Sequence, residues 1–345
     1  MHLKTVQISN FRRLKNVSID LETGTTVFVG ANNSGKTSAA SVLRLLVKGR
    51  AKGLTVFDFS ASCLESLREI EDSEPGQEPP LPAITLDLWF DVTENDLGRV
   101  VDLLPSLDWN DQPVGIRLQY RPRSESELLS RYREAKSAAE LKSDTTYHPW
   151  PSSLQEYLEK KLHSEYELAY FVLEHEIAEG EQHAYSPTAH PLQNSKGEAA
   201  VTLDGLLTLD YLDAQRFLSE TSFNDHLAQV FESTLGSLNA LGYPGVEDPE
   251  LVIRSSFTAD QIMAQDTSIQ YSLPRAEGDL VGIRLPEKYN GLGFKNLIYM
   301  VIKMLDFHQQ WVTQDERTPV HLVIVEEPEA HLHAQLQQVF ISKMQ

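Results

Sequence analysis

The stretch Phe28-Val29-Gly30-Ala31-Asn32-Asn33-Ser34-Gly35-Lys36-Thr37-Ser38 decides the fold class of this 345-residue chain. It contains the phosphate-loop pattern, in which a glycine, four residues and a second glycine precede lysine and then serine or threonine. The apolar run Thr25–Val29 predicts a buried strand before the loop, and the apolar spacing over Ser38–Val47 predicts a helix after it. Strand, glycine loop and helix in this order predict an α/β P-loop NTPase.

The residue types in this loop suit the binding of Mg²⁺·ATP. Gly30 and Gly35 let backbone N–H groups curve around the β-phosphate, where a side chain would collide. Lys36 is expected to reach the β- and γ-phosphates, and the Thr37 hydroxyl is expected to ligate Mg²⁺. A glycine turn before a helix would not need lysine followed by threonine. The residues expected to bind the nucleotide are Gly30, Ala31, Asn32, Asn33, Ser34, Gly35, Lys36, Thr37 and Ser38.

A second motif lies near the end of the sequence, where the apolar run Val320–Val325 precedes Glu326, Glu327 and Pro328. A strand that ends in adjacent carboxylates is the Walker B arrangement. Because neighbours on a strand point in opposite directions, Glu326 is expected to hold Mg²⁺ and Glu327 to act as general base on the attacking water. The two acids could instead cap a helix that begins near Pro328. The P-loop earlier in the chain favours the catalytic interpretation.

A glycine-containing stretch precedes a helix that we predict from about Phe294 to Gln310. Adjacent metal-binding and catalytic acids are typical of ABC-type ATPases, in which a glycine loop at a helix start completes the site of a second subunit. Chain order assigns Asn290, Gly291 and Gly293 to this signature loop. An ordinary Asn-Gly turn is the alternative. The signature assignment predicts a homodimer or higher homo-oligomer joined through its ATP sites.

The composition limits the compartment and the partners. The only cysteine, Cys63, excludes an internal disulfide, and no apolar run approaches the ~18 residues of a membrane span. A cytoplasmic protein without membrane contact is therefore expected. The net charge is −20, but residues 1–60 hold nine Lys or Arg and three acids. Any DNA contact should come from this N-terminal basic segment or from a polypeptide outside this sequence.

The remaining patterns predict an ATPase core of residues 1–60 and 200–345, approximately, with an insertion between them. In the insertion, Glu74–Pro82 is expected to be a loop, and an antiparallel sheet and a helical arm are expected around it. The predicted strands are Leu3–Ile8, Val17–Leu21, Ile84–Val92, Gly115–Tyr120, Glu167–Val172, Leu206–Leu212 and Ser268–Leu273. The predicted helices are Glu125–Lys142, Leu154–Leu162, Phe223–Leu241 and one that begins near His331 and is still running at Gln345, which is typical of a fragment.

Three strings in the sequence resemble the OLD (overcoming lysogenisation defect) family of ATP-dependent endonucleases. They are Val6–Arg12, Phe28–Ser38 and Glu326-Glu327-Pro328-Glu329-Ala330-His331-Leu332-His333. The resemblance implies an ABC-type ATPase with an antiparallel β subdomain and an inserted helical arm, and it places Arg12 among the nucleotide-binding residues. It also implies a role in DNA metabolism, plausibly in anti-phage defence.

In the OLD family a Toprim nuclease domain follows the ATPase. No such domain is expected in these 345 residues, so we do not expect this chain alone to cleave DNA. Two other interpretations stay open. One is a chromosome-maintenance or recombination ATPase that acts as an ATP-gated DNA clamp, although neither a long coiled coil nor a Ser-Gly-Gly-Gln loop occurs in the sequence. The other is an ATP-dependent sensor that scaffolds a separate effector.

Overall fold

The described part of the chain forms two compact units. A computed structural model describes residues 1–31, 34–74, 76–105, 109, 111–141, 150–174, 188–192, 203–213, 250–255, 267–272, 284–286 and 292–328. The first unit is Met1–Leu209 with Thr318–Val320, and the second is Asp210–Arg317 with His321–Gln345. Within the described ranges, no helix combines the length and the apolar composition that a membrane crossing needs.

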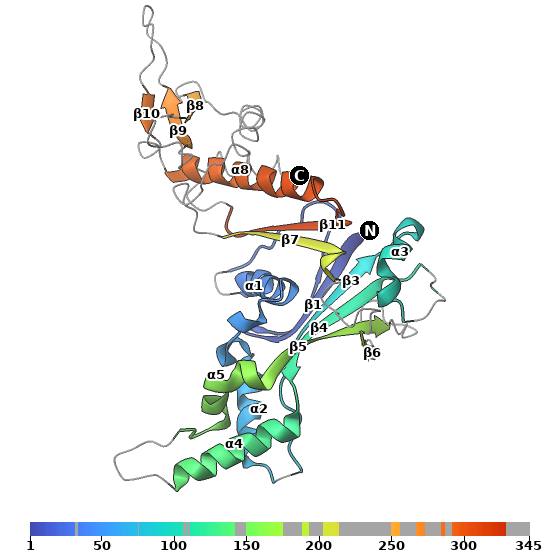
Figure 1. Ribbon diagram of the computed structural model, residues 1–345, viewed down its shortest axis with the longest axis vertical. Helices are drawn as coiled ribbons and strands as arrows, with labels where there is room; N and C mark the ends of the chain where they lie inside the picture. Colours follow the sequence, from blue (N-terminus) through green and yellow to red (C-terminus); the bar gives the residue numbers. More distant parts are fainter. Residues whose placement is uncertain are drawn as a thin grey trace, which may run out of the picture. The chain divides into compact units, whose positions relative to one another are not determined.

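The first unit is built on a six-stranded sheet with the order β2-β1-β3-β4-β5-β6 (Figure 1). Every neighbouring pair in it is antiparallel. The strands are β1 (His2–Phe11), β2 (Leu14–Asp20), β3 (Ile84–Asp91), β4 (Val114–Pro122), β5 (Tyr166–Glu174) and β6 (Thr188–Pro191). The first five confirm predicted strands with slightly different bounds. Because β1 pairs with both β2 and β3, the strands of the predicted insertion continue the sheet of the N-terminal hairpin, and the boundary near residue 60 stays a prediction.

Strand β3 is buried on both faces, whereas alternation of its apolar residues predicted burial of one face only. The second face carries Asp87 and Trp89, whose exposed fractions are 4% and 1%. Arg117 of β4 donates to both carboxylate oxygens of Asp87 at 2.7 Å. Burial raises the pKa of Asp87, and Arg117 opposes that shift. A cross-strand ion pair therefore satisfies the one acidic group that this burial takes from water.

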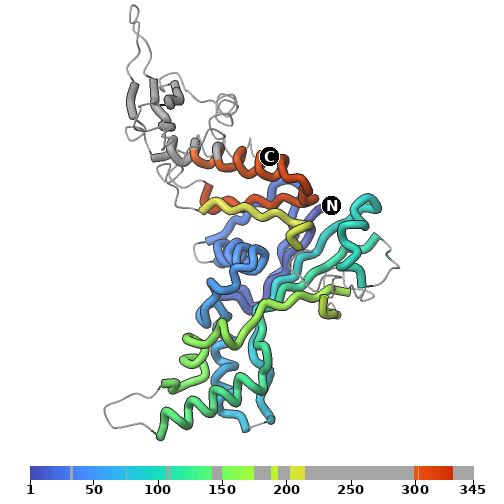
Figure 2. Tube along the Cα trace, viewed as in Figure 1, coloured from blue at the N-terminus to red at the C-terminus, as the bar shows by residue number. Residues whose placement is uncertain are grey.

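Three helices of the first unit form an arm at one end of the sheet (Figure 2). They are α2 (Ala61–Asp72), α4 (Glu125–Glu140) and α5 (Leu154–Glu165). Helices α4 and α5 confirm two predicted helices. Glu71 of α2 joins all three, because it accepts hydrogen bonds from the Lys136 ammonium, from the Tyr132 hydroxyl at 2.7 Å and from the Leu154 amide at 3.2 Å. Burial acts to raise the pKa of Glu71, but these donors together lower it below its ordinary value.

The other helical elements of the first unit are short, apart from the helix that follows the P-loop. That helix is α1 (Lys36–Val47), and it confirms the prediction over Ser38–Val47. The short elements are η1 (Ala51–Gly53), η2 (Val56–Asp58), η3 (Glu94–Asp96), α3 (Leu97–Val100) and η4 (Val101–Leu103). Among its described residues, Glu74–Pro82 has no helix or strand, as predicted.

The segment before the P-loop corrects one prediction. Thr25–Val29 was expected to be a buried strand, but it has extended irregular backbone, and Val29 is 90% exposed. The β1–β2 ladder ends where the Leu21 amide donates to the Lys4 carbonyl, and a turn follows in which the Glu22 amide donates to Thr26 Oγ1. An apolar run becomes a strand only beside a hydrogen-bonding neighbour, and none of the described residues forms a ladder with this run.

The second unit contains a long helix and further strands. They are α8 (Leu292–Val312) and the sheet β10-β9-β8, formed by β8 (Glu250–Ser255), β9 (Thr267–Ser272) and β10 (Arg284–Pro286). Strands β7 (Leu207–Leu212) and β11 (Val320–Val325) pair with each other, and each begins in the first unit and continues in the second. The Val320 amide donates to the Leu206 carbonyl, and the Glu326 amide donates to the Leu212 carbonyl. Residue numbers rise in the same direction on both sides of the pair, so the two strands are parallel.

Four predicted elements of the C-terminal half are confirmed by β7, β9, α8 and β11. The predicted helix over Phe223–Leu241 and the predicted helix from His331 lie outside the described residues. The described part is therefore a mixed α/β structure with an antiparallel six-stranded sheet and a parallel strand pair.

Candidate functional site

Two glycines of the P-loop occupy positions that no other residue could fill without a local shift. Gly35 has φ +102°, and a Cβ atom there would lie 2.9 Å from Leu14 Cδ2. A Cβ atom on Gly30 would lie 2.8 Å from Ser34 Oγ. Both glycines therefore lie where the backbone comes close to a neighbouring side chain. Asn32 and Asn33 lie outside the described residues.

The start of α1 is suited to an anion. Gly35 is the N-cap, no side chain caps the helix, and its first turn holds no acidic residue. The N–H groups of that turn and the positive end of the helix dipole are thus unopposed by a carboxylate. The Lys36 ammonium folds back over the loop, where it donates to the Gly30 carbonyl at 2.5 Å and to the Ala31 carbonyl at 3.0 Å. Thr37 is exposed beside it, and Ser38 is half-buried.

The β1–β2 turn lies against the P-loop, because the side chain of Leu14 contacts Gly35. In this turn Arg12 has φ +49°, and its amide donates to the Asp58 carbonyl at 2.7 Å. Its Nε donates to Asp58 Oδ1 at 2.8 Å, and its guanidinium lies 4.9 Å from the centre of the Phe11 ring. No sequence pattern singled out Asp58, which holds Arg12 in place through these two contacts. The predicted contact between Arg12 and nucleotide stays a prediction.

The two acids of the second motif follow β11 and do not lie within it. Glu326 still takes part in the strand pair, through its amide bond to Leu212 at 3.0 Å. Glu327 has φ +44° and is exposed. The left-handed region costs a non-glycine residue on the order of 1–3 kcal/mol, and a residue before proline prefers extended backbone. The sequence suggested that strand alternation orients Glu326 and Glu327. In the structure a turn at Glu327 sets their orientation instead.

The candidate signature loop is described only in part. Gly293 is the second residue of α8, so it belongs to the first turn of the helix and not to the loop before it. Asn290 and Gly291 lie outside the described residues. The P-loop belongs to the first unit and Glu326 and Glu327 to the second, so each part of the candidate site is described within its own unit.

Oxygen donors are the groups that the chain offers to a magnesium ion. Among the described residues, no three His, Cys, Asp or Glu side chains gather into a ready-made metal site. The Thr37 hydroxyl and the Glu326 carboxylate are of the chemical type that Mg²⁺ prefers, and Mg²⁺ commonly takes only one or two protein ligands beside phosphates and water. Each of these two side chains is therefore of a ligand type that suits Mg²⁺, and their joint role stays a prediction.

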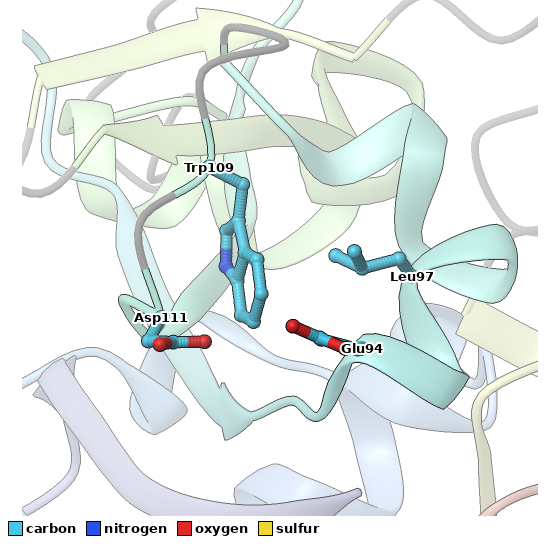
Figure 3. Close-up of a pocket in the computed structure, with 4 residues that line it drawn as sticks. All are labelled: Glu94, Leu97, Trp109 and Asp111. Atoms are coloured by element: carbon cyan, nitrogen blue, oxygen red, sulfur yellow. The ribbon is translucent and has the colours of Figure 1, made fainter.

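A pocket of about 480 Å³ lies away from the P-loop residues, beside η3 and α3. Its described lining residues are Glu94, Leu97, Trp109 and Asp111 (Figure 3). Two carboxylates beside an indole ring would repel a phosphate group. This pocket is thus unsuited to ATP, and the P-loop remains the candidate nucleotide site.

Known proteins resemble this chain over its whole length. A family model described as an AAA ATPase domain matches residues 1–216 and 206–345. Endonuclease GajA of Bacillus cereus (strain HuB5-5) is 19% identical over 379 residues, which cover 100% of this chain and 54% of that protein. The chain thus spans about half the length of this relative. The match to a solved structure from work on ATP-driven dimerization and DNA stimulated activation of SMC ATPases covers 36% of this chain and 66% of the other chain, with 19% identity and a TM-score of 0.24.

Proposed function

The chain belongs to the AAA ATPase domain family, and from this premise we propose that it binds Mg²⁺·ATP at Gly30–Ser38 and hydrolyses it with Glu326 and Glu327. The observation that carries the proposal is the shape of the P-loop. Its two glycines are folded where a Cβ atom would collide, and the Lys36 ammonium lies over the loop, held by the carbonyls of Gly30 and Ala31. The loop thus supplies a cation beside the start of α1, where the first N–H groups have no side-chain cap.

Each side chain then has one task in the reaction. Lys36 neutralises charge on the β- and γ-phosphates. Thr37 and Glu326 would hold Mg²⁺, which would neutralise the negative charge that develops on the phosphates. Glu327 accepts the proton of the water that attacks the γ-phosphate. The exposure of Glu327 and its turn conformation favour this role, because an exposed carboxylate is accessible to water and to a nucleotide.

We further propose the ABC arrangement, in which two copies of the chain join through their ATP sites. Asn290, Gly291 and Gly293 would then contact the nucleotide of the other copy. The support is positional, since Gly293 lies in the first turn of a 21-residue helix, where N–H groups lack helical partners. A helix of this length behaves as a rigid rod, so a shift at its first turn would also move its last turn.

The larger role that we propose is that of the ATPase module of an OLD-family DNA endonuclease used against phage. The relative that matches the whole chain is named an endonuclease, and this chain spans about half of its length. The N-terminal basic segment supports contact with DNA, because Lys15, Arg50 and Lys52 are all exposed. Cleavage itself is proposed to need residues beyond these 345.

The nucleotide experiment compares wild-type protein with Lys36→Ala and with Lys52→Ala as a matched control. ATP is titrated by calorimetry, and phosphate release is measured in Mg²⁺. Loss of charged hydrogen bonds, worth about 1.5–3 kcal/mol each, should weaken ATP binding by at least about tenfold in Lys36→Ala. Lys52→Ala should bind as wild type, because this exposed lysine lies outside the P-loop. Unchanged affinity in Lys36→Ala would refute the site.

The DNA experiment incubates the chain with supercoiled plasmid, ATP and Mg²⁺ or Mn²⁺. We expect no nicking, since the carboxylates assigned by motif serve the γ-phosphate of ATP. ATP-dependent retention of the plasmid without nicking would favour the clamp alternative. Nicking that persists in Lys36→Ala would place a nuclease within these residues and overturn this part of the proposal.

A further inference from the structure

The last turn of α8 is joined to strand β11 by stacked side chains. The ring of Trp311 lies against the ring of His321, with 5.1 Å between centroids and 29° between planes. The Arg317 guanidinium carbon lies 4.7 Å from the centre of the Trp311 ring. Three residues from the helix end, the following loop and the strand therefore form one stack, and all of them belong to the second unit.

His321 is also held from a second side. Its Nε2 lies 2.9 Å from Asp210 Oδ2, and Asp210 belongs to β7. The side chains of His321 and Asp210 are 9% and 19% exposed. The imidazole is thus fixed in both position and ring orientation, because Trp311 packs on its face while Asp210 bonds its edge. This makes His321 a junction between the helix and the strand pair.

The two elements that meet at this junction lead to two parts of the proposed ATPase site. Helix α8 begins at Leu292, directly after Asn290 and Gly291 of the candidate signature loop. Strand β11 ends at Val325, directly before Glu326 and Glu327. A helix and a hydrogen-bonded strand are both stiff along their length, so a displacement at one end appears at the other.

We propose that Trp311, His321 and Asp210 are positioning residues, which couple the placement of α8 to the placement of Glu326 and Glu327. When the start of α8 engages nucleotide, the stack transmits the shift to β11 and brings the carboxylates into position for hydrolysis. This inference rests on the proposed function of those carboxylates. It adds that hydrolysis depends on a contact formed by residues that touch neither ATP nor Mg²⁺.

A purely structural role would have a different signature. Removing a merely stabilising contact lowers the amount of folded protein and leaves each folded molecule with normal turnover. Removing a coupling contact lowers kcat per folded molecule while KM for ATP stays nearly the same. The conservative replacement also differs, because phenylalanine at position 311 keeps a ring against His321, whereas alanine does not.

The experiment measures kcat and KM for ATP in full-length wild type, Trp311→Ala, Trp311→Phe and His321→Gln. Mutations along coupling contacts change coupling by about twofold to thirtyfold, so kcat should fall within that range in Trp311→Ala and His321→Gln. KM should stay within about twofold, and Trp311→Phe should recover most of the wild-type kcat. Val312→Ala is the matched control, because Val312 is adjacent on the same helix and 46% exposed.

Tryptophan emission gives a second readout. In Glu327→Gln, which should retain bound ATP, addition of ATP should change the emission, and the change should be lost when Trp311→Phe is added. Wild-type kcat in both Trp311→Ala and His321→Gln overturns the coupling. If circular dichroism shows that Trp311→Ala does not fold, the kcat of His321→Gln alone tests the coupling. Absence of ATP hydrolysis in wild type, or full hydrolysis by Glu327→Gln, would instead overturn the proposed function.

Discussion

Two apolar runs lead into the nucleotide motifs, and they form different structures. Val320–Val325 is strand β11, paired with β7 and half-buried along its length. Thr25–Val29 is of similar composition, but it is irregular and exposed. The difference lies in strand pairing, since β11 pairs with a parallel strand and Thr25–Val29 forms no ladder with any described strand. Apolar composition alone thus gives a tendency to be buried, and a hydrogen-bonded neighbour gives the strand.

The motifs that follow the two runs are alike in one respect, since contacts close in sequence shape both of them. The P-loop is folded by contacts within a few residues of itself, such as Lys36 with Gly30 and Ala31. The turn at Glu327 is likewise local, set by one left-handed residue before a proline. Most of the geometry at the end of either run is therefore short-range, whereas the burial of the run depends on distant partners.

The largest expected effect concerns the end of the paired run. Glu327→Gln replaces the general base by an amide that cannot accept the water's proton. We expect ATP hydrolysis to fall by about 10²–10⁴-fold while ATP binding is kept. Phosphate release and calorimetry measure the two properties separately. If the ABC arrangement holds, ATP should also trap a dimer, visible by light scattering. A variant that hydrolyses ATP at the wild-type rate would move the base to another residue.

The next effect tests the partner of the paired run. Leu209 lies in β7 and is 2% exposed. Leu209→Ala should lower the free energy of unfolding by about 2–5 kcal/mol, because it removes buried methyl groups and leaves a cavity. Urea titration followed by circular dichroism measures this change. A loss below about 0.5 kcal/mol would mean that the β7 side chain at Leu209 is not part of a packed core. Pairing with β7 would then not explain why β11 is half-buried.

A smaller effect is expected at the charged junction of the helical arm, where partners are again distant in sequence. Glu71→Gln should lower the free energy of unfolding by about 1–3 kcal/mol at neutral pH, since Lys136 loses its carboxylate. The pKa of Glu71 lies below its ordinary value of 4.5, so the folded state favours the ionised form. Its contribution is therefore complete above pH 4.5 and is lost as pH falls through the lowered pKa.

The measurement is urea unfolding at a series of pH values. Below pH 4.5 the stability of the wild type should fall more steeply than that of Glu71→Gln, so the two curves converge. Glu69→Gln is the control, because Glu69 is exposed on the same helix. Parallel curves for wild type and Glu71→Gln would show that the junction does not depend on the charge of Glu71.

The smallest effect is expected in Thr25–Val29, the run that does not form a strand. Val29→Ala should change the free energy of unfolding by less than about 0.5 kcal/mol, because the side chain is 90% exposed. The same urea titration applies, with Leu209→Ala as the contrasting buried site. A loss above about 2 kcal/mol would show that Val29 is buried in the folded protein. The contrast between the two runs would then disappear.

The sequence predicted elements well where the signal was local. Helices α1, α4, α5 and α8 and strands such as β4, β5 and β11 follow from periodicity and from flanking glycine or proline. At the two P-loop glycines the predicted approach to a β-phosphate stays a prediction, whereas the close neighbours in the structure are the side chains of Leu14 and Ser34.

Contacts between distant segments escaped prediction. Arg12 with Asp58, Arg117 with Asp87 and Trp311 with His321 each join residues with no shared periodicity. The pairing of β3 with β1 of the N-terminal hairpin was not predicted for the same reason. Alternation in a strand shows which residues share a face but not which strand lies beside it. One sequence of a single protein carries no information on such pairings.

The order of strands around β1 also has a consequence for how the first unit folds. Strand β1 reaches β2 through a tight turn, with Phe11 opposite Leu14, whereas its other neighbour pairs Ser9 with Thr85. Pairing β1 with β3 costs more chain entropy and is slower than pairing β1 with β2, because the segment that contains α1 and α2 forms a long loop between the two strands. The P-loop lies within that loop. During refolding, the hairpin should therefore appear early, and the capacity to bind ATP should appear only as β3 docks.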